Sequence, residues 1–187
     1  MKTLIKILMA MTVVFSISMP GMAQPTKADK EAAKIAAVKQ LIQSKNYVFK
    51  AQYVYPLNND VIQLLNGQGA GNPRYLNYGY DLQVKPDTII SYLPYFGEAY
   101  FNVGYNSTND SGIKFTSTKF DYATTEKKKG KFLINIKPKD ARYTNQLILT
   151  ISATGSASLS VISVNRQSIT FTGYVEDKEK PKETTKS

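Results

Sequence analysis

The chain has 187 residues, with 24 lysines and arginines against 14 acidic residues, and it contains neither cysteine nor histidine. This composition excludes thiol nucleophiles, serine–histidine and cysteine–histidine pairs, disulfides, and zinc sites built from sulfur or nitrogen ligands. The formal net charge of +10 suits contact with anionic molecules.

The N-terminus is predicted to be an export signal over residues 1–23. Lys2 and Lys6 flank the start of an apolar run at residues 7–17, and small residues precede a cleavage site after Ala23. About 11 apolar residues cannot cross a bilayer that needs roughly 20, so we expect no transmembrane segment in the mature chain. We expect a periplasmic or secreted protein, which meets anionic glycans, lipid head groups and cell-wall polymers before nucleic acid. No nucleic-acid partner is therefore expected.

The mature chain begins with one predicted helix, in the segment 24–46. Apolar side chains at Ala28, Ile35, Val38 and Ile42 fall near one side of a 3.6-residue wheel, and most of the lysines lie away from them. We expect an amphipathic helix that packs on the rest of the domain.

Residues 47–175 are predicted to be an antiparallel β domain, because the apolar period changes there from 3.6 to two. The first strand alternates from Tyr47 to Tyr55. A hairpin follows, with a turn at residues 85–87, and a single strand is expected to run from Ile113 to Thr124. The remaining strands contain the following apolar residues: Phe132, Ile134 and Ile136; Leu147, Leu149 and Ile151; Ala157, Leu159 and Val161; and Ile169, Phe171 and Val175.

The predicted fold is mainly β, an antiparallel meander closing into a barrel or a strongly bent two-layer sheet, lipocalin-like, with one N-terminal helix. Short strands with one apolar face each, at a spacing of roughly 8–12 residues, are typical of such folds. One helix cannot cover so many strands, so the sheet must bury its apolar faces against itself. Residues 176–187 balance acids with lysines and lack apolar residues, which predicts a disordered charged tail.

Three stretches carry a resemblance to a known family. They are YGYDLQVKPDTIISYLPYFGEAY from Tyr78, GIKFTSTKFDYATTEKKKGKFLINIK from Gly112, and LTISATGSASLSVISVNRQSITFTGYVE from Leu149. Together they resemble the bacterial family described as domain of unknown function 4251, over roughly residues 30–176. The resemblance implies an exported protein of Bacteroidetes-type bacteria with a single domain, and no activity or catalytic residues come with it.

An aromatic segment supplies the first candidate ligand-binding residues. Six aromatic side chains fall within 14 residues, beside Pro94 and Gly97, and the ligand-binding residues predicted among them are Tyr92, Tyr95, Phe96, Tyr100 and Tyr105. Such a loop could hold rings over a pocket, where they stack on sugars or apolar ligands. The alternative is that the rings plug one end of the barrel.

Arginines are the second group of candidates: Arg74, Arg142 and Arg166 each lie in or beside a predicted turn. An arginine on a pocket rim can hold a carboxylate or phosphate through two parallel hydrogen bonds. The alternative is a solvated or ion-paired surface position, and sequence separation does not decide whether the three meet.

The leading hypothesis from the sequence is a non-enzymatic, exported β-barrel that binds an apolar or glycan-like small molecule, without a metal or cofactor. The alternative is an envelope module that presents a sheet edge or the aromatic loop to a partner protein. A third possibility is a hydrolase with paired carboxylates, although nothing in the spacing of the acids selects a pair. The candidate acids are Asp81, Asp87, Glu98, Asp110, Asp121 and Glu126.

Overall fold

A computed structural model of the chain describes residues 26–57, 63, 74–98, 100 and 112–178. The predicted export signal and most of the charged tail lie outside these residues. The chain divides into two compact units, Met1–Lys30 and Glu31–Ser187. Among the helices in the described part of the chain, none combines the length and apolar character that a membrane crossing requires.

The first unit ends inside helix α2 (Lys27–Ser44), whose residues 27–30 belong to it. The backbone N–H of Asp29 donates to the Thr26 hydroxyl oxygen at 3.2 Å, and the Asp29 carboxylate accepts from the Thr26 N–H at 3.0 Å. This reciprocal pair is a capping box, which satisfies N–H groups that have no partner inside the helix. Hydrogen bonds from Thr26 also lower the pKa of Asp29.

Within the second unit, α2 packs on the sheet only near its end. Ile42 is 2% exposed, and Val38 and Leu41 are half-buried against the core, but Ile35 is 36% exposed. The predicted helix is therefore confirmed, and its apolar face is buried only over the last two turns. The helix ends where Lys45 takes a positive φ of 51°.

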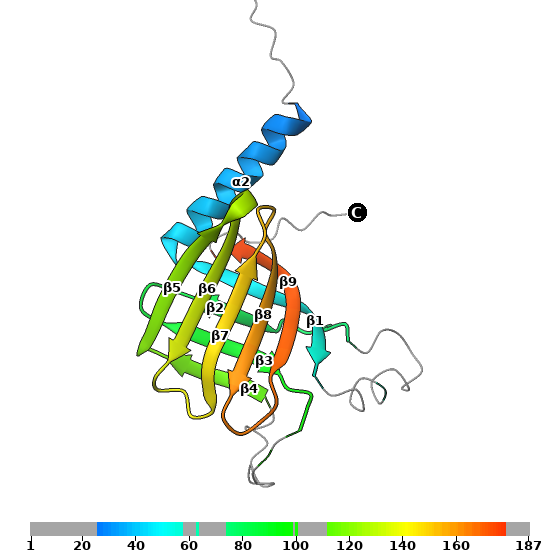
Figure 1. The fold of residues 1–187 in the computed structure, drawn as a ribbon, viewed down its shortest axis with the longest axis vertical. Helices are drawn as coiled ribbons and strands as arrows, with labels where there is room; N and C mark the ends of the chain where they lie inside the picture. The colour runs from blue at the N-terminus through cyan, green and yellow to red at the C-terminus, as the bar shows by residue number, and fades with distance from the viewer. Residues whose placement is uncertain (1–25, 58–62, 64–73, 99, 101–111, 179–187) are drawn as a thin grey trace, which may run out of the picture. The chain divides into compact units, whose positions relative to one another are not determined.

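The second unit is mainly β, as predicted, and nine strands in the described residues form one antiparallel sheet (Figure 1). In chain order they are β1 (Tyr47–Pro56), β2 (Asp81–Val84), β3 (Ile89–Pro94), β4 (Gly112–Ser117), β5 (Phe120–Lys127), β6 (Lys131–Pro138), β7 (Thr144–Ile151), β8 (Ser156–Ser163) and β9 (Ile169–Asp177). A short 3₁₀ turn, η1 (Lys128–Gly130), links β5 to β6. The order in the sheet is β4-β3-β2-β1-β9-β8-β7-β6-β5.

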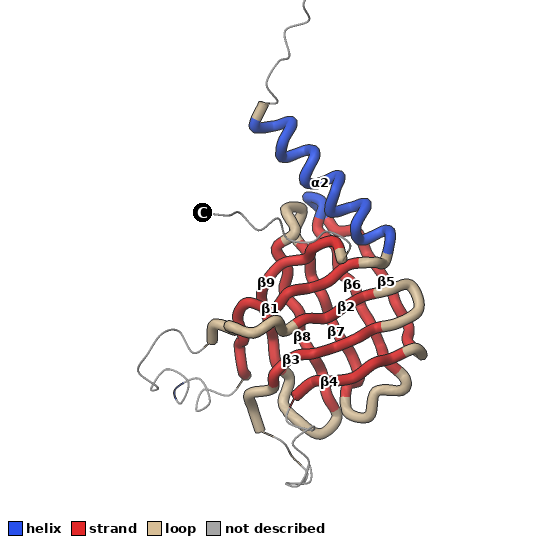
Figure 2. The backbone as a smooth tube through the Cα atoms, turned by 180° about the vertical axis from the view of Figure 1, so that it is seen from behind, coloured by secondary structure: helices blue, strands red, loops and turns tan. Residues whose placement is uncertain are grey.

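The sheet bends into two layers and nearly closes into a barrel, which confirms the predicted fold class. Strands β1 to β4 form one layer and cross over β5 to β8 of the other (Figures 1 and 2). On one side the layers are joined by continuous pairing of β1 with β9. On the other side the chain itself turns from β4 into β5 at residues 118–119, although these two strands are the opposite ends of the sheet order.

This turn corrects the prediction of one strand from Ile113 to Thr124. The carboxylate of Asp140 accepts hydrogen bonds from the N–H groups of Thr118, at 3.0 Å, and Lys119, at 3.2 Å, and from the Ser117 hydroxyl. The chain can therefore leave one layer and enter the other within two residues. Asp140 lies in the β6–β7 loop, and sequence alternation carries no information about such a distant partner.

A bulge in β1 corrects a second prediction. Pairing with β9 shifts by one residue between Ala51 and Tyr53, so the buried residues after the bulge are Val54 and Pro56. The sequence predicted Tyr53 and Tyr55 on the same face as Tyr47, but Tyr55 is 43% exposed. A single extra residue reverses the faces because side chains alternate with a period of two.

Large side chains fill the space between the layers. Tyr47, Phe49 and Phe171 are fully buried together with leucines and isoleucines from both layers. The hydroxyl groups of Tyr47 and Tyr122 lie 3.1 Å apart, which satisfies the polar end of a ring that is otherwise in the core. Most of the rest of this core consists of apolar residues at the alternating positions that the sequence predicted, and Val54 after the bulge and Leu76 before β2 are additions to them.

Candidate functional site

The structure brings together three of the predicted site residues, Tyr95, Arg142 and Arg166, at one end of the sheet. Tyr95 follows β3, Arg142 lies in the loop between β6 and β7, and Arg166 lies in the loop between β8 and β9. The guanidinium of Arg166 lies over the Tyr95 ring at 4.7 Å from its centroid. The question that sequence separation left open is thus answered for two of the three arginines.

Backbone hydrogen bonds hold the aromatic segment against the β8–β9 loop. The N–H of Tyr100 donates to the Asn165 carbonyl at 2.8 Å, and the N–H of Gln167 donates to the Glu98 carbonyl at 3.1 Å. The Tyr95 hydroxyl lies within hydrogen-bond distance of the Glu98 and Gln167 carbonyls, at 2.9 and 3.1 Å. The side chain of Tyr95 is therefore fixed at both ends, by its hydroxyl and by the cation on its ring.

The side chains of the other aromatic candidates differ in their burial. Phe96, like Tyr95, is half-buried and packs against the core. Tyr100 is 59% exposed, and Tyr92 lies on the outer face of β3, 47% exposed. Tyr105 lies outside the described residues. Arg74 does not join the other two arginines, because it precedes β2 and lies 6.0 Å from the Tyr55 ring.

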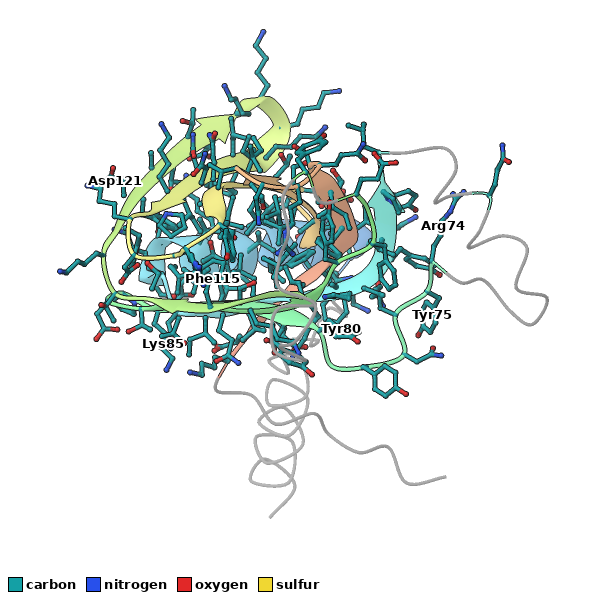
Figure 3. All side chains as sticks on the ribbon, turned by 90° about the horizontal axis from the view of Figure 1, so that it is seen from below. Arg74, Tyr75, Tyr80, Lys85, Phe115 and Asp121 are labelled. Carbon is teal, nitrogen blue, oxygen red and sulfur yellow. The ribbon has the colours of Figure 1, made fainter. Side chains whose placement is uncertain are left out.

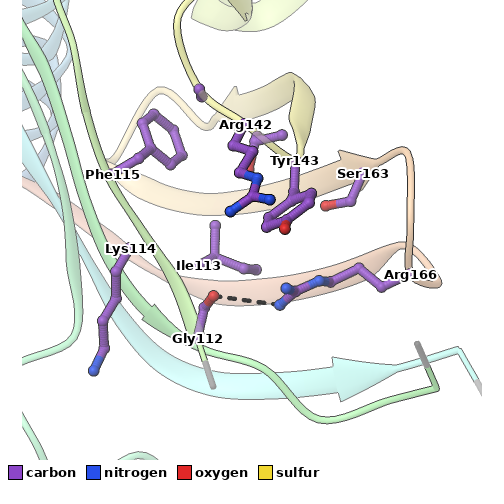
Figure 4. A pocket seen from close by; sticks show the side chains of 10 residues that line it. Gly112, Ile113, Lys114, Phe115, Arg142, Tyr143, Ser163 and Arg166 are labelled. Carbon is purple, nitrogen blue, oxygen red and sulfur yellow. Dashed lines mark hydrogen bonds between the residues drawn. The ribbon is translucent and has the colours of Figure 1, made fainter. Parts of the chain in front are cut away.

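Arg142 and Arg166 line a cleft of about 100 Å³ at this end (Figure 4). One wall is the beginning of β4, and the other is formed by the β6–β7 loop and the ends of β7 and β8. The cleft is lined by Gly112, Ile113, Lys114, Phe115, Ala141, Arg142, Tyr143, Thr144, Ser163 and Arg166. In Figure 4, Lys114 points away from the two arginines.

Arg166 is the residue that defines the electrostatics of the cleft. It is only 6% exposed. One terminal nitrogen donates to the Gly112 carbonyl at 3.3 Å, and the ring of Tyr143 lies 5.9 Å away on a second side. Its Nε has no hydrogen-bond partner among the described residues. A buried guanidinium with one neutral acceptor is under-compensated, because burial removes the water that would otherwise solvate the charge.

The neighbouring side chains increase the positive character of the cleft. Arg142 is exposed and lies over the same Tyr143 ring at 4.9 Å. No carboxylate is among the described residues that line the cleft. The carboxylates on adjoining segments have other partners, since Glu98 accepts from the Gln167 side chain at 3.1 Å and Asp140 holds the β4–β5 turn. Burial raises the pKa of Tyr95, and the charge of Arg166 opposes that shift.

Tyr143, Thr144 and Ser163 also line this cleft and were not predicted from the sequence. The signal that points to Tyr143 is its position directly after Arg142 between two strands, where a ring can support a cation. Thr144 and Ser163 face each other as paired residues of β7 and β8. Nothing in the local sequence distinguishes these hydroxyl groups from the many others in the strands.

The candidate acids are engaged separately in the described part of the chain. Asp81 pairs with Lys50 at 2.9 Å, Asp121 with Lys139 at 2.7 Å, and Glu126 with Lys39 at 3.0 Å. Asp81 is only 8% exposed. Asp110 lies outside the described residues, among which no group of three acids is arranged to hold a metal ion.

Comparison with known proteins agrees with this architecture. A crystal structure of a DUF4251 family protein from Bacteroides eggerthii DSM 20697 has a similar fold, with a TM-score of 0.50 and 17% identity, over 79% of this chain and 91% of that chain. A search of curated proteins gives no match. The family model "Domain of unknown function (DUF4251)" matches residues 29–175, which contain the helix, the sheet and both walls of the cleft. The chain therefore belongs to the DUF4251 family.

Proposed function

We propose that this protein is an exported, non-enzymatic binding protein whose cleft receives the anionic group of a glycan-like ligand. The observation that carries the proposal is Arg166, a buried guanidinium whose Nε lacks a partner in the described residues. An incoming carboxylate, sulfate or phosphate would supply an acceptor that the described residues do not, and arginine presents its donors in a planar fork that suits these groups.

Other groups in the cleft support the same ligand class. Arg142 adds a second cation, and the hydroxyls of Thr144 and Ser163 can donate to anionic oxygens. The Tyr143 ring lies within cation–π distance of both guanidinium groups, at 4.9 Å from that of Arg142 and 5.9 Å from that of Arg166. These features favour a charged ligand over an apolar one.

The size of the cleft limits how much of a ligand can enter. Its volume of about 100 Å³ is below the roughly 300–1,000 Å³ that enclose a whole drug-sized molecule. The core between the two layers is filled by large side chains, so the described residues hold no barrel interior comparable to that of a lipid carrier. One acidic group would enter, and the rest of the glycan would lie outside.

Titration calorimetry with D-galacturonate, and with D-galactose as the matched neutral sugar, tests this proposal. We expect binding of the acid only, weakened by added salt. Arg166→Lys should reduce affinity at least about tenfold, because lysine cannot provide the planar fork. Arg142→Ala, at an exposed position, gives a second variant that should fold normally, and Arg74→Ala is the charge-matched control outside the cleft. Equal affinity for both sugars, or for the Arg142 and Arg74 variants, would disprove the proposal.

One observation favours the alternative of an envelope interaction module. Strand β5 pairs only with β6 in the described residues, and most of its side chains are exposed. An unpaired edge of eight residues can accept a strand from another protein. Hydrogen exchange on a co-purified complex would test this: slower exchange of the amides at residues 120–127 supports the module, and unchanged exchange there counts against it.

A further inference from the structure

A second hollow lies on the outer face of the sheet, where β1 meets β9 and the segment before β2. Its volume is about 280 Å³, and it shares no lining residue with the cleft. We call it the tyrosine hollow and define it by Lys50, Tyr75, Asn77, Tyr78, Tyr80 and Tyr174. Tyr75 and Tyr80 are labelled in Figure 3, at the side of the layer that contains β1 to β4.

The β1 bulge and the segment 74–80 create this hollow. The segment bonds to β1 on both sides of the bulge: the Val54 N–H donates to the Arg74 carbonyl, the Leu76 N–H to the Gln52 carbonyl, and the Ala51 N–H to the Tyr80 carbonyl, at 2.8–3.0 Å. Between these attachments, residues 77–79 stay exposed. The chain therefore bows away from β1 and leaves space beneath it.

The tyrosine rings around the hollow are braced by other rings. Tyr80 stacks on Tyr92 with centroids 5.5 Å apart and an interplanar angle of 24°. Tyr78 meets Tyr80 edge-on at 6.1 Å, yet it is 75% exposed. Tyr75 is 46% exposed and contacts Tyr53 at 5.3 Å. Rings held in this way present flat surfaces to solvent with little conformational entropy to lose on binding.

The charge at the base of the hollow is balanced, unlike that of the cleft. The Lys50 ammonium donates to the Asp81 carboxylate at 2.9 Å, and these side chains are only 29% and 11% exposed. Register places them in one row across the outer face, because Asp81 pairs with Lys50 and Lys50 pairs with Tyr174. A lysine already paired with a carboxylate gives no net attraction for an anion.

We propose that the tyrosine hollow binds a sugar ring of a neutral oligosaccharide. The ring faces of the tyrosines suit the apolar C–H faces of a pyranose, and the Asn77 and Gln52 amides with the tyrosine hydroxyls can pair with its hydroxyl groups. The volume of about 280 Å³ suits one ring with its substituents. An apolar ligand fits less well, because it would cover these amides without offering them hydrogen-bond partners.

This site is independent of the anionic group proposed for the cleft, and separate variants test it. Cellotetraose, maltotetraose and mannotetraose serve as neutral probes in saturation-transfer NMR and calorimetry. We expect at least one of them to bind wild-type protein. Tyr78→Ala removes a highly exposed ring and should weaken that binding by about fivefold or more, by analogy with the loss of one stacking ring. The matched control Tyr55→Ala removes a ring of similar type outside the hollow and should leave affinity unchanged.

Two further results separate this proposal from others. Arg142→Ala, which removes one of the cations of the cleft, should retain binding of the neutral probe, so that failure at one site is distinguishable from failure at the other. If none of the three tetrasaccharides binds, or if Tyr78→Ala and Tyr55→Ala behave alike, the proposal is wrong. An envelope protein that binds stoichiometrically, is lost on Tyr78→Ala and meets no competition from the sugars would identify a protein interface instead.

Discussion

Among the glycines that the structure describes, Gly173 in β9 is the position at which an added Cβ would approach another atom most closely. It pairs with Ala51 beside the β1 bulge, and a Cβ placed on it would lie 1.8 Å from the Lys50 carbonyl oxygen and 3.2 Å from the Gln52 nitrogen. Cβ atoms essentially never approach other heavy atoms within 3.0 Å. Both neighbours are backbone atoms that cannot rotate away, so strands β1 and β9 must separate by roughly 1 Å. Packed interiors transmit such a displacement to their surroundings.

The cost of Gly173→Ala follows from that separation. Overpacking typically costs about 1–3 kcal/mol, and each weakened backbone hydrogen bond adds roughly 0.5–1.5 kcal/mol. We therefore expect a loss of about 3 kcal/mol in the free energy of unfolding, a large part of the roughly 5–15 kcal/mol of a typical domain. For a domain of this size the midpoint of thermal unfolding should fall by roughly 6–12 °C.

Urea and thermal unfolding followed by circular dichroism would measure this loss. Gly79→Ala is the matched control, because a Cβ there meets no atom within 4 Å, and its stability should stay within about 0.5 kcal/mol of wild type. Since Tyr174 lines the tyrosine hollow next to Gly173, sugar binding should weaken with the glycine variant as well. Equal stability of the two alanine variants would show that β1 and β9 do not pack as closely at Gly173 as described.

Three other predictions concern the turn, the core and the surface. Asp140→Ala should lower the melting temperature by freeing the β4–β5 turn. Hydrogen bonds from Ser117 and Thr118 lower the pKa of Asp140, so its stabilising effect should be present above the unfolded pKa near 3.8 and fade as the pH falls through the lower folded value. Acid titration of both proteins would show this difference. Burial raises the pKa of Tyr47 well above 10, so the free energy of unfolding should decline as pH rises beyond about 10. In urea titrations, Tyr47→Phe should lose roughly 1 kcal/mol of that free energy at neutral pH and show a smaller decline at alkaline pH. Lys39→Ala breaks an exposed ion pair with Glu126 and should change the free energy of unfolding by less than about 0.5 kcal/mol, because solvent screens exposed pairs. A larger shift of the urea unfolding midpoint would contradict this.

The site could be predicted only in part. Arg142 and Arg166 are visible as arginines beside turns, and Tyr95 belongs to an obvious aromatic segment. Their meeting depends on three loops that gather at one end of the sheet, and no local pattern describes that arrangement. The tyrosine hollow is less visible still, because it depends on a bulge that moves Tyr55 outward and on a segment that bows over β1.

The period of apolar residues by itself determined that one helix is followed by antiparallel strands, and that those strands must shield one another. That information is local, since each side chain's face follows from its neighbours along the chain. Tertiary structure alone decided where the layers join, which residue reverses the faces of β1, and why Arg166 is buried without a full set of partners among the described residues. Those features arise from contacts between residues far apart in sequence, such as Asp140 with Thr118 and Gly173 with Lys50. The alternation of apolar and polar residues along a strand carries no information about such contacts.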